Sequence, residues 1–272
     1  MTEPAIVTEK LTRRFGTGDT SLLAVDQMDL SVGAGQFFGF LGPNGAGKST
    51  TIKMLTGLLA PTAGRIRLLG LDLAAHPIEV KRQIGVVPEG LALYDRLTGA
   101  EHLKFVARMY GLDRHTAAQR AGELLEFMQI ADRPKTQIAD YSHGMQKKLA
   151  LAAAVIHAPR VLFLDEPFES VDAVAAGTLK AMLSRMIARG ATIFLTSHVL
   201  EIVERLCSHV AIIDKGNLVA QGSLEDLRAG VEASRTDGSG QPAAREKLTL
   251  EQIFLEMVGG SRAAGQEISW LA

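Results

Sequence analysis

The chain has 272 residues, of which 47% are hydrophobic, so it can bury the core of one large domain or two small ones. Its formal net charge of −1 excludes a strongly basic nucleic-acid-binding chain and also an acidic, solvating composition. The single cysteine, Cys207, cannot form an internal disulfide and favours a reducing compartment.

Neither the first residues nor the apolar stretches have the pattern of a targeting or membrane-spanning segment. Residues 1–10 mix charged residues with a short apolar run, unlike a signal peptide. The longest apolar stretches, such as residues 149–156, are far shorter than the roughly 20 residues that span a bilayer. We therefore expect a soluble, cytosolic chain; if it acts at a membrane, another protein supplies the membrane segments.

The first thirty residues predict strands. Residues 5–12 are expected to form one strand, and residues 22–32 alternate apolar and polar side chains like a strand or hairpin. Phe15 follows the first of these. An aromatic ring in this position can stack on a nucleotide base, although a partly buried edge aromatic is the more common arrangement.

Residues 42–50 match the phosphate-binding pattern G-x-x-x-x-G-K-S/T. The apolar run 37–41 predicts a buried strand before this loop, and residues 48–58 predict a helix after it. Glycines let the backbone N–H groups point at phosphate oxygens, and the helix amino terminus adds positive charge. We expect Lys48 to reach the β- and γ-phosphates and the Ser49 hydroxyl to ligate Mg²⁺. The loop consists of Gly42, Pro43, Asn44, Gly45, Ala46, Gly47, Lys48, Ser49 and Thr50.

Two further strands follow the loop and its helix. Residues 65–70 alternate like a half-exposed strand, and residues 84–88 form a short apolar run that Pro88 ends. Glu89 then stands at the carboxyl end of a strand, where open α/β sheets bind their ligands. A ligand-binding role and a solvated loop acid are equally compatible with this position.

Residues 98–128 change to helical periodicity and are predicted to form a helical insert within an α/β protein. One apolar face of this insert consists of Leu103, Val106, Met109 and Tyr110. A connecting loop is expected over residues 134–141.

Ser142 is predicted to cap a helix that runs to about Ile156. The open N–H groups of its first turn, together with Ser142 and Gly144, suit an anion, although an ordinary capped helix is the simpler interpretation. Lys147 and Lys148 lie in the following turn, where they are unusual partners for the helix dipole but could face solvent.

Residues 161–164 predict a strand buried on both faces, which ends in Asp165 and Glu166. Four apolar residues followed by an acid are typical of the Walker B motif, in which the aspartate holds Mg²⁺ through water. Because side chains alternate along a strand, Glu166 should point elsewhere, toward the position of a hydrolytic water that it orients and deprotonates. An acidic pair in a turn is the alternative, which the upstream phosphate loop makes improbable.

A helix is predicted over residues 173–189 and a strand over residues 191–195. His198 follows that strand, where it could donate to a γ-phosphate or serve equally well as a cap or turn residue. Further on, a helix over residues 200–207 and strands over residues 210–213 and 218–221 are expected.

Residues 229–246 are rich in small and polar residues and predict a flexible linker. Thr249 and Gln252 could form a capping box for a short amphipathic helix over residues 250–258. Docking of this helix on the rest of the chain is favoured over a role as a dimerisation or partner element.

Taken together, residues 11–227 resemble the nucleotide-binding subunit of ABC (ATP-binding cassette) transporters. The most specific element is Tyr-Ser-His-Gly-Met at residues 141–145, which is similar to the family signature L-S-G-G-Q and precedes the Walker B strand. The resemblance implies that Phe15 stacks on adenine and that Glu89 occupies the Q-loop position. It likewise makes Asp172 the D-loop aspartate and His198 the switch histidine.

The sequence departs from the family pattern at several positions. His143 and Met145 replace Gly and Gln in the signature, Glu89 replaces the Q-loop glutamine, and the D-loop at residues 169–172 is unusual. A signature of this kind, with Glu in the Q-loop and without a fused permease, looks most like the exporter branch whose membrane subunits are separate proteins.

The resemblance implies an α/β fold: a P-loop NTPase (RecA-like) core with an N-terminal antiparallel β subdomain and an inserted α-helical subdomain. The implied domains are an ATPase domain (1–228) with its insert at about 91–159, a flexible linker (229–246) and a C-terminal helical tail (247–272). The implied catalytic residues are Glu166, His198 and Lys48. The implied metal ligands are Ser49, Glu89 and Asp165. Nucleotide contacts are implied for the nine loop residues and for Phe15, Glu89, Ser142, Gly144, Asp165 and Asp172.

The implied function is hydrolysis of ATP with Mg²⁺ to drive export. The implied partners are a transmembrane permease and a second ATP-binding subunit, identical or different, with no nucleic acid. We therefore expect a cytoplasmic protein held at the inner face of the cell membrane by the permease. The alternatives are a soluble ABC ATPase acting on ribosomes or DNA, which usually has two cassettes, coiled coils or zinc sites, and a regulator with no transport role.

Overall fold

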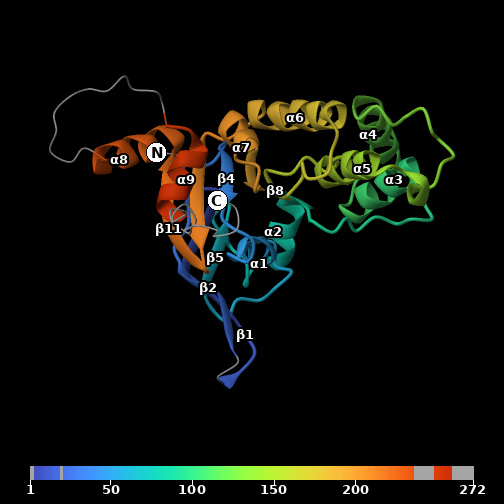
Figure 1. Ribbon diagram of the computed structural model, residues 1–272. Coiled ribbons are helices and arrows are strands. Elements are labelled where there is room, and N and C mark those ends of the chain that lie inside the picture. Colours follow the sequence, from blue (N-terminus) through green and yellow to red (C-terminus); the bar gives the residue numbers. More distant parts are fainter. Residues whose placement is uncertain (1–2, 19–20, 236–247, 259–272) are drawn as a thin grey trace.

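The computed structural model describes residues 3–18, 21–235 and 248–258 (Figure 1). Its first sheet is antiparallel, with the strand order β2-β1-β5-β6, and β3 also pairs with β1. Its strands are β1 Ile6–Phe15, β2 Leu22–Met28, β3 Ser31–Val32, β5 Ala63–Leu68 and β6 Leu71–Asp72. Strand β1 therefore extends three residues beyond the predicted carboxyl end at residue 12 and includes Phe15.

The central sheet has the order β11-β10-β4-β9-β8-β7, in which β10, β4, β9, β8 and β7 are parallel and β11 is antiparallel to β10. Its strands are β4 Phe37–Leu41, β7 Ile84–Val87, β8 Val161–Asp165, β9 Thr192–Thr196, β10 His209–Asp214 and β11 Asn217–Ser223. Because parallel strands end at the same edge, the segments that follow β4, β7, β8 and β9 lie along one edge of the sheet.

The helices are α1 Lys48–Leu55, α2 Pro77–Gln83, α3 Gly99–Met109, α4 Arg114–Phe127, α5 His143–Val155, α6 Ala173–Ala188, α7 Leu200–Leu206, α8 Leu224–Arg235 and α9 Leu250–Val258, with a 3₁₀ turn, η2, at Ile138–Asp140. None of the helices in the described ranges is long and apolar enough to cross a membrane. Helix α2 was not predicted from the sequence, and α1 ends three residues before its predicted end.

The central sheet separates two apolar cores. Along β4, Phe38 and Phe40 face the core shared with the antiparallel sheet and α1, where the Phe38 ring stacks on Phe194 with centroids 5.6 Å apart. Phe37 and Leu41 point to the opposite core, which includes residues of the helical subdomain, α6 and α7. All five residues of β4 and of β8 are buried, as their continuous apolar runs predict for central parallel strands.

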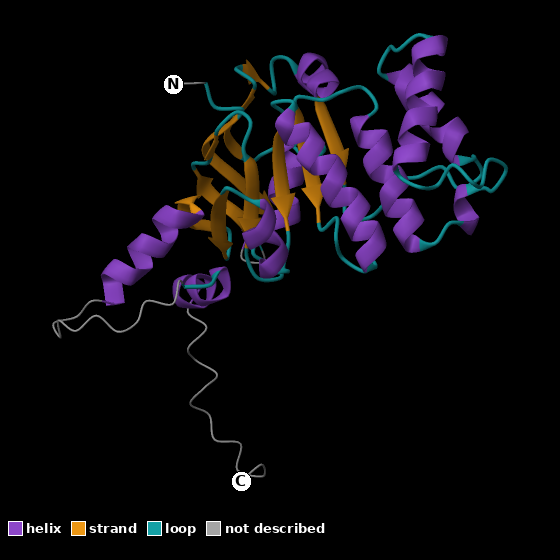
Figure 2. Ribbon diagram, turned by 90° about the horizontal axis from the view of Figure 1, so that it is seen from above, coloured by secondary structure: helices purple, strands orange, loops and turns teal. Residues whose placement is uncertain are grey.

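The predicted helical range 98–128 is two helices, because Asp113 caps a second one. Thr98 and Glu101 form a capping box at the start of α3. The predicted apolar face is wrong at one position: Met109 is 72% exposed. The helical subdomain (α3, α4, η2 and α5) lies at one end of the molecule, and α8 lies at the other (Figure 1 and Figure 2).

The C-terminal helices correct one prediction and confirm another. Helix α8 runs to Arg235, so the first part of the predicted linker, residues 229–235, is helical; residues 236–247 lie outside the described ranges. Thr249 and Gln252 form the predicted capping box, and Ile253 is fully buried as α9 packs on α7, α8, β10 and β11. The tail from residue 259 onward is also outside the described ranges.

Candidate active site

The phosphate loop joins β4 to α1 and is held by close backbone contacts on two sides. A Cβ atom at Gly42 would lie 2.3 Å from the carbonyl oxygen of Ile213 in β10. A Cβ atom at Gly47 would lie 2.4 Å from the carbonyl oxygen of Ala24 in β2, and Gly47 also has a φ of 108°. Both positions therefore require glycine, because a side chain would push the loop away from the two sheets.

The amino terminus of α1 is suited to bind an anion. Its N-cap residue, Gly47, offers no side-chain acceptor to the first N–H groups, and the first turn contains no acidic residue. Those N–H groups and the positive end of the helix dipole point toward the loop. The loop and helix together form the arrangement that binds phosphate groups in proteins.

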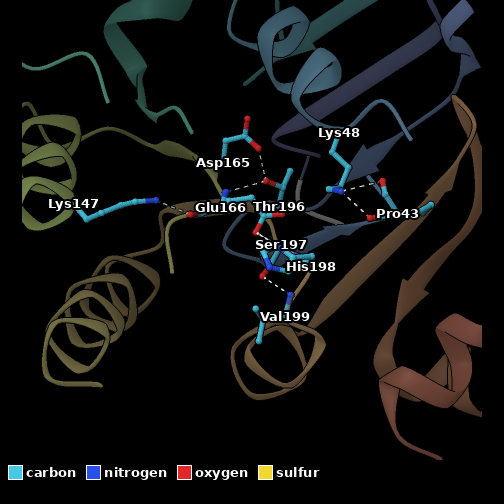
Figure 3. A network of polar contacts seen from close by, with 10 residues as sticks. Pro43, Lys48, Lys147, Asp165, Glu166, Thr196, Ser197, His198 and Val199 are labelled. Atoms are coloured by element: carbon cyan, nitrogen blue, oxygen red, sulfur yellow. Dashed lines mark hydrogen bonds and ion pairs between the residues drawn. The ribbon is translucent and has the colours of Figure 1, made fainter. Parts of the chain in front are cut away.

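Lys48 is buried and bonded to the loop that precedes it. Its Nζ donates to the carbonyl oxygens of Gly42 at 2.7 Å and Pro43 at 3.2 Å (Figure 3). Burial lowers the pKa of Lys48, because it disfavours the charged form. Three carboxylates act on that pKa in the opposite direction, those of Glu166, Asp165 and Glu89.

A threonine hydroxyl links the carboxyl ends of β8 and β9. The register of the two strands places Thr196 beside Asp165, and Thr196 Oγ1 donates to Asp165 Oδ1 at 2.6 Å. The same hydroxyl oxygen accepts from the backbone N–H of Glu166 at 3.1 Å. All three residues are buried, so the Asp165 carboxylate is held in one orientation at the sheet edge.

Glu166 leaves the strand with a φ of 49°, a conformation that is uncommon for residues other than glycine. Its carboxylate Oε2 accepts from the backbone N–H of His198 at 3.2 Å and lies 3.0 Å from His198 Nδ1 (Figure 3). The structure thus brings together an acid and an imidazole that are 32 positions apart in the sequence. Backbone strain of this kind is concentrated at functional sites.

The interpretation that Lys147 and Lys148 could face solvent is wrong. They are only 3% and 7% exposed. Lys147 Nζ donates to the carbonyl oxygen of Glu166 at 2.8 Å, on the side of the acid that is away from Lys48 (Figure 3). Helical spacing could not reveal this burial, which arises because α5 packs against α6 and β7.

Comparison with known families identifies the chain. Residues 25–169, more than half of its length, match the family model described as ABC transporter. The chain belongs to the ABC transporter family. As a family member it contains an ATP-binding domain with ATPase architecture, and the P-loop NTPase core predicted from the sequence is confirmed.

Relatives of this ABC protein include ATP-binding subunits from bacteria. The linearmycin resistance ATP-binding protein LnrL of Bacillus subtilis is 39% identical over 75% of this chain and 65% of its own length, just under two thirds. The Nod factor export ATP-binding protein I of Cupriavidus metallidurans is 37% identical over 87% of this chain and 79% of its own length. A solved structure of an ABC transporter ATP-binding subunit superposes with a TM-score of 0.80 at 30% identity, covering 93% of this chain and 99% of that one.

The signature segment of this ABC chain opens α5. Ser142 is its N-cap residue, with the hydroxyl oxygen accepting from Met145 N at 3.3 Å, as predicted. Beside it, a Cβ atom at Gly144 would lie 3.3 Å from Asp172 Oδ2, so the signature and the D-loop position adjoin within one subunit. Asp172 itself caps α6 by accepting from Val174 N and Ala175 N. Within the described ranges, no hydrogen bond joins Ser142 or Gly144 to the phosphate loop.

Phe15 and Glu89 are among the predicted nucleotide contacts that lie at the surface. Phe15 ends β1 opposite Leu22 of β2, the strand that touches Gly47. The residue is 36% exposed, and the Arg13 guanidinium lies 4.5 Å from the centroid of its ring. Glu89 follows β7 and is exposed, yet its charge reaches Lys48. Their roles toward a nucleotide remain predictions.

Two residues next to the site were not assigned a role from the sequence. Thr196 could have been found by applying to β9 the sheet-edge argument that was applied to Asp165 on β8. Phe254 of α9 lines a cavity of about 190 Å³ together with Pro43, Asn44 and His198. No local pattern signals that contact, because Phe254 lies 56 positions from His198 and 211 from Pro43 in the sequence.

Proposed function

We propose that this chain is the ATP-hydrolysing subunit of an ABC exporter whose transmembrane permease is a separate protein. The observation that carries the proposal is the Glu166–His198 pair beside a phosphate loop, since this pair supplies a base and its orienting partner at the sheet edge where ATP binds. Two relatives, one named for linearmycin resistance and one for Nod factor export, support the export direction.

In this proposal the nucleotide is held by the phosphate loop, with adenine against Phe15. The loop N–H groups bind the β- and γ-phosphates, and Lys48 exchanges its two carbonyl contacts for phosphate oxygens. Phe15 is 36% exposed, which leaves surface on this residue for the base.

The residues present fit Mg²⁺. A serine hydroxyl at the first turn of α1 and the buried Asp165 carboxylate are oxygen donors, which Mg²⁺ prefers, and Glu89 adds negative charge. Among the described residues no cluster of three or more His, Cys, Asp or Glu side chains could hold a metal alone, in keeping with an ion that is shared with phosphate oxygens. When bound, Mg²⁺ neutralises charge on the phosphates.

Hydrolysis is assigned to Glu166 and His198. Glu166 orients the attacking water and accepts its proton. His198 holds the Glu166 carboxylate through its backbone N–H and Nδ1, so Nε2 is the ring nitrogen left for the γ-phosphate.

We place two subunits head to tail, so that Ser142 and Gly144 of one face the phosphate loop of the other. ATP closes this dimer because its γ-phosphate contacts both subunits, and hydrolysis removes the bridge. The ligand thereby shifts the equilibrium through contacts that exist only in the closed state. Whether the two subunits are identical depends on the transporter.

The helical insert, about residues 91–159 of an ATPase domain spanning 1–228, is proposed to dock on the permease at the inner face of the membrane. Its surface exposes three large apolar side chains, those of Tyr94, Phe105 and Met109. Tyr94 and Phe105 pack edge to face with centroids 5.3 Å apart. An exposed apolar cluster of this kind is typical of a protein–protein contact.

The test is purification of the tagged full-length chain from gently solubilised membranes, followed by mass spectrometry. We expect a polytopic membrane protein in stoichiometric amount, and addition of that protein should raise ATP turnover. Recovery of ribosomes or DNA-repair factors, or a chain without a membrane partner, would contradict the transport role.

A further inference from the structure

The acidic edge of the central sheet lies between two buried lysines (Figure 3). Lys48 lies on the phosphate-loop side and contacts that loop. Lys147 lies on the other side, in the second turn of α5, and its Nζ contacts the backbone of Glu166. Lys48 has an assigned role toward phosphate, whereas the proposed hydrolysis makes no use of Lys147.

Lys147 contacts Glu166, the residue of the site whose backbone is strained. Glu166 has a left-handed backbone, with its N–H bonded to Thr196 Oγ1 and its carbonyl oxygen bonded to Lys147 Nζ at 2.8 Å. The N–H of Glu169 reaches the same carbonyl at a longer distance, 3.3 Å. These bonds hold the peptide groups on both sides of the Glu166 Cα, so they also hold the direction of the carboxylate that faces His198.

Burying a lysine for this purpose is costly, because burial disfavours its charged form. The cost is offset by four nearby carboxylates, those of Glu169, Glu166, Glu89 and Asp165. If Lys147 served only to fill space in the core, an apolar side chain would do so at a lower cost. Its burial among carboxylates therefore argues for a role of the ammonium group itself.

We propose that Lys147 is a positioning residue that connects the signature helix α5 to the catalytic Glu166 of the same subunit. The consequence rests on the head-to-tail dimer of the proposed function. In that dimer the Ser142 end of α5 faces the ATP of the partner subunit, whereas Glu166 acts on the ATP of its own phosphate loop. Lys147 therefore couples the two ATP sites through a single side chain, and closure around one ATP sets the base at the other.

The experiment compares Lys147→Met and Lys147→Arg in the full-length chain with wild type and with a matched control, Gln146→Met. The control residue neighbours Lys147 on α5 and also donates to a backbone carbonyl, but that carbonyl belongs to Ile138 in the helical subdomain. ATP turnover is measured against ATP concentration, and ATP-dependent dimer formation is measured by size-exclusion chromatography.

We expect Lys147→Met to lower kcat by about 100-fold, the size of effect that a displaced catalytic group produces. The KM for ATP should change by less than about threefold, because nucleotide binding does not involve Lys147. The variant should still form the ATP-dependent dimer and accumulate in it. Lys147→Arg, which keeps a cationic donor, should recover much of the turnover, and Gln146→Met should behave like wild type.

The inference would be overturned if Lys147→Met turned over ATP like wild type, or if Gln146→Met lost as much activity as Lys147→Met. It would also be overturned if Lys147→Met lost ATP-dependent dimer formation together with turnover, or if Lys147→Arg did not recover turnover. If Lys147→Met does not fold by circular dichroism, Lys147→Gln, which has a shorter polar side chain, gives the same comparison. A wild-type chain that does not hydrolyse ATP would instead overturn the proposed function, so the two failures are distinguishable.

Discussion

Glu166 Oε2 lies 3.0 Å from His198 Nδ1 and accepts the His198 backbone N–H at 3.2 Å. The backbone N–H and the imidazole of His198 thus both contact the carboxylate of Glu166, which is a buried residue. The pair lies at the carboxyl ends of neighbouring parallel strands, β8 and β9. This contact is the reason that we propose Glu166, and not Asp165, as the base.

Replacing Glu166 with Gln removes the proton acceptor but keeps the shape of the side chain. We expect this variant to bind ATP, to accumulate as a closed dimer and to turn over roughly 10²- to 10⁴-fold more slowly, the range for loss of general-base catalysis. Steady-state phosphate release and size-exclusion chromatography with ATP measure the two effects. Brisk turnover in this variant would refute the role assigned to Glu166.

Lys48→Ala removes the cation closest to the phosphate loop. We expect ATP affinity to fall by about 10- to 100-fold, the value of one lost charge-assisted hydrogen bond. Titration with a fluorescent ATP analogue measures the change. Lys53→Ala is the control, because Lys53 lies on the same helix and is exposed; equal affinities for the two variants would count against the assignment.

Thr196→Val keeps the size of a buried side chain and removes its hydroxyl. Asp165 Oδ1 loses its donor and the N–H of Glu166 loses one acceptor, so we expect the free energy of unfolding to fall by about 1–3 kcal/mol. Turnover should fall as well. Thr178→Val, which removes a hydroxyl bonded to the Val174 carbonyl on α6, serves as the control in urea unfolding. A stability for Thr196→Val equal to that of the control would exclude a structural role for this hydroxyl.

Ile253→Ala tests whether α9 is part of the folded ATPase unit. Ile253 is fully buried, so its truncation should lower the free energy of unfolding by about 2–5 kcal/mol. Leu255, two residues further on, is 48% exposed, and Leu255→Ala should change the stability by less than about 0.5 kcal/mol. A single urea transition that shifts only for Ile253→Ala is expected, whereas no shift would mean that α9 does not add to the core.

The cap of α4 predicts a pH dependence of stability. The Thr116 hydroxyl and then the Thr116 N–H lower the pKa of Asp113 from 3.8 to about 2. Because the folded-state pKa is depressed, the ionised cap stabilises above the unfolded value, and this contribution is lost as the pH falls through about 2.

Asp113→Asn keeps a side-chain acceptor at the cap but does not titrate. We therefore expect wild type to have the higher Tm near neutral pH and the difference to shrink steadily below pH about 4. Thermal unfolding followed by circular dichroism measures both proteins across this range. A Tm difference that does not change with pH would show that the carboxylate charge contributes nothing.

Much of this protein follows from its sequence alone. The strand before the phosphate loop, the apolar runs that end at Asp165 and at Thr196, and the caps at Ser142 and Thr249 are all local patterns, set by backbone hydrogen bonding within a few residues. Such patterns also predict that the ends of the parallel strands share one edge. These patterns indicated a phosphate loop and an acidic strand end at one edge of the sheet, whereas Phe15, Glu89, Ser142 and His198 received roles only from the resemblance to the ABC family.

Only the tertiary structure decided how those residues meet. Glu166 and His198 are 32 positions apart, and Lys147 and Glu166 are 19 apart, so their contacts depend on how strands and helices pack and not on any spacing in the sequence. The same reason explains the errors. Lys147 could be interpreted as facing solvent because one helix considered by itself does not reveal which face another element will cover, and burial of that face by α6 and β7 is a property of the assembled fold.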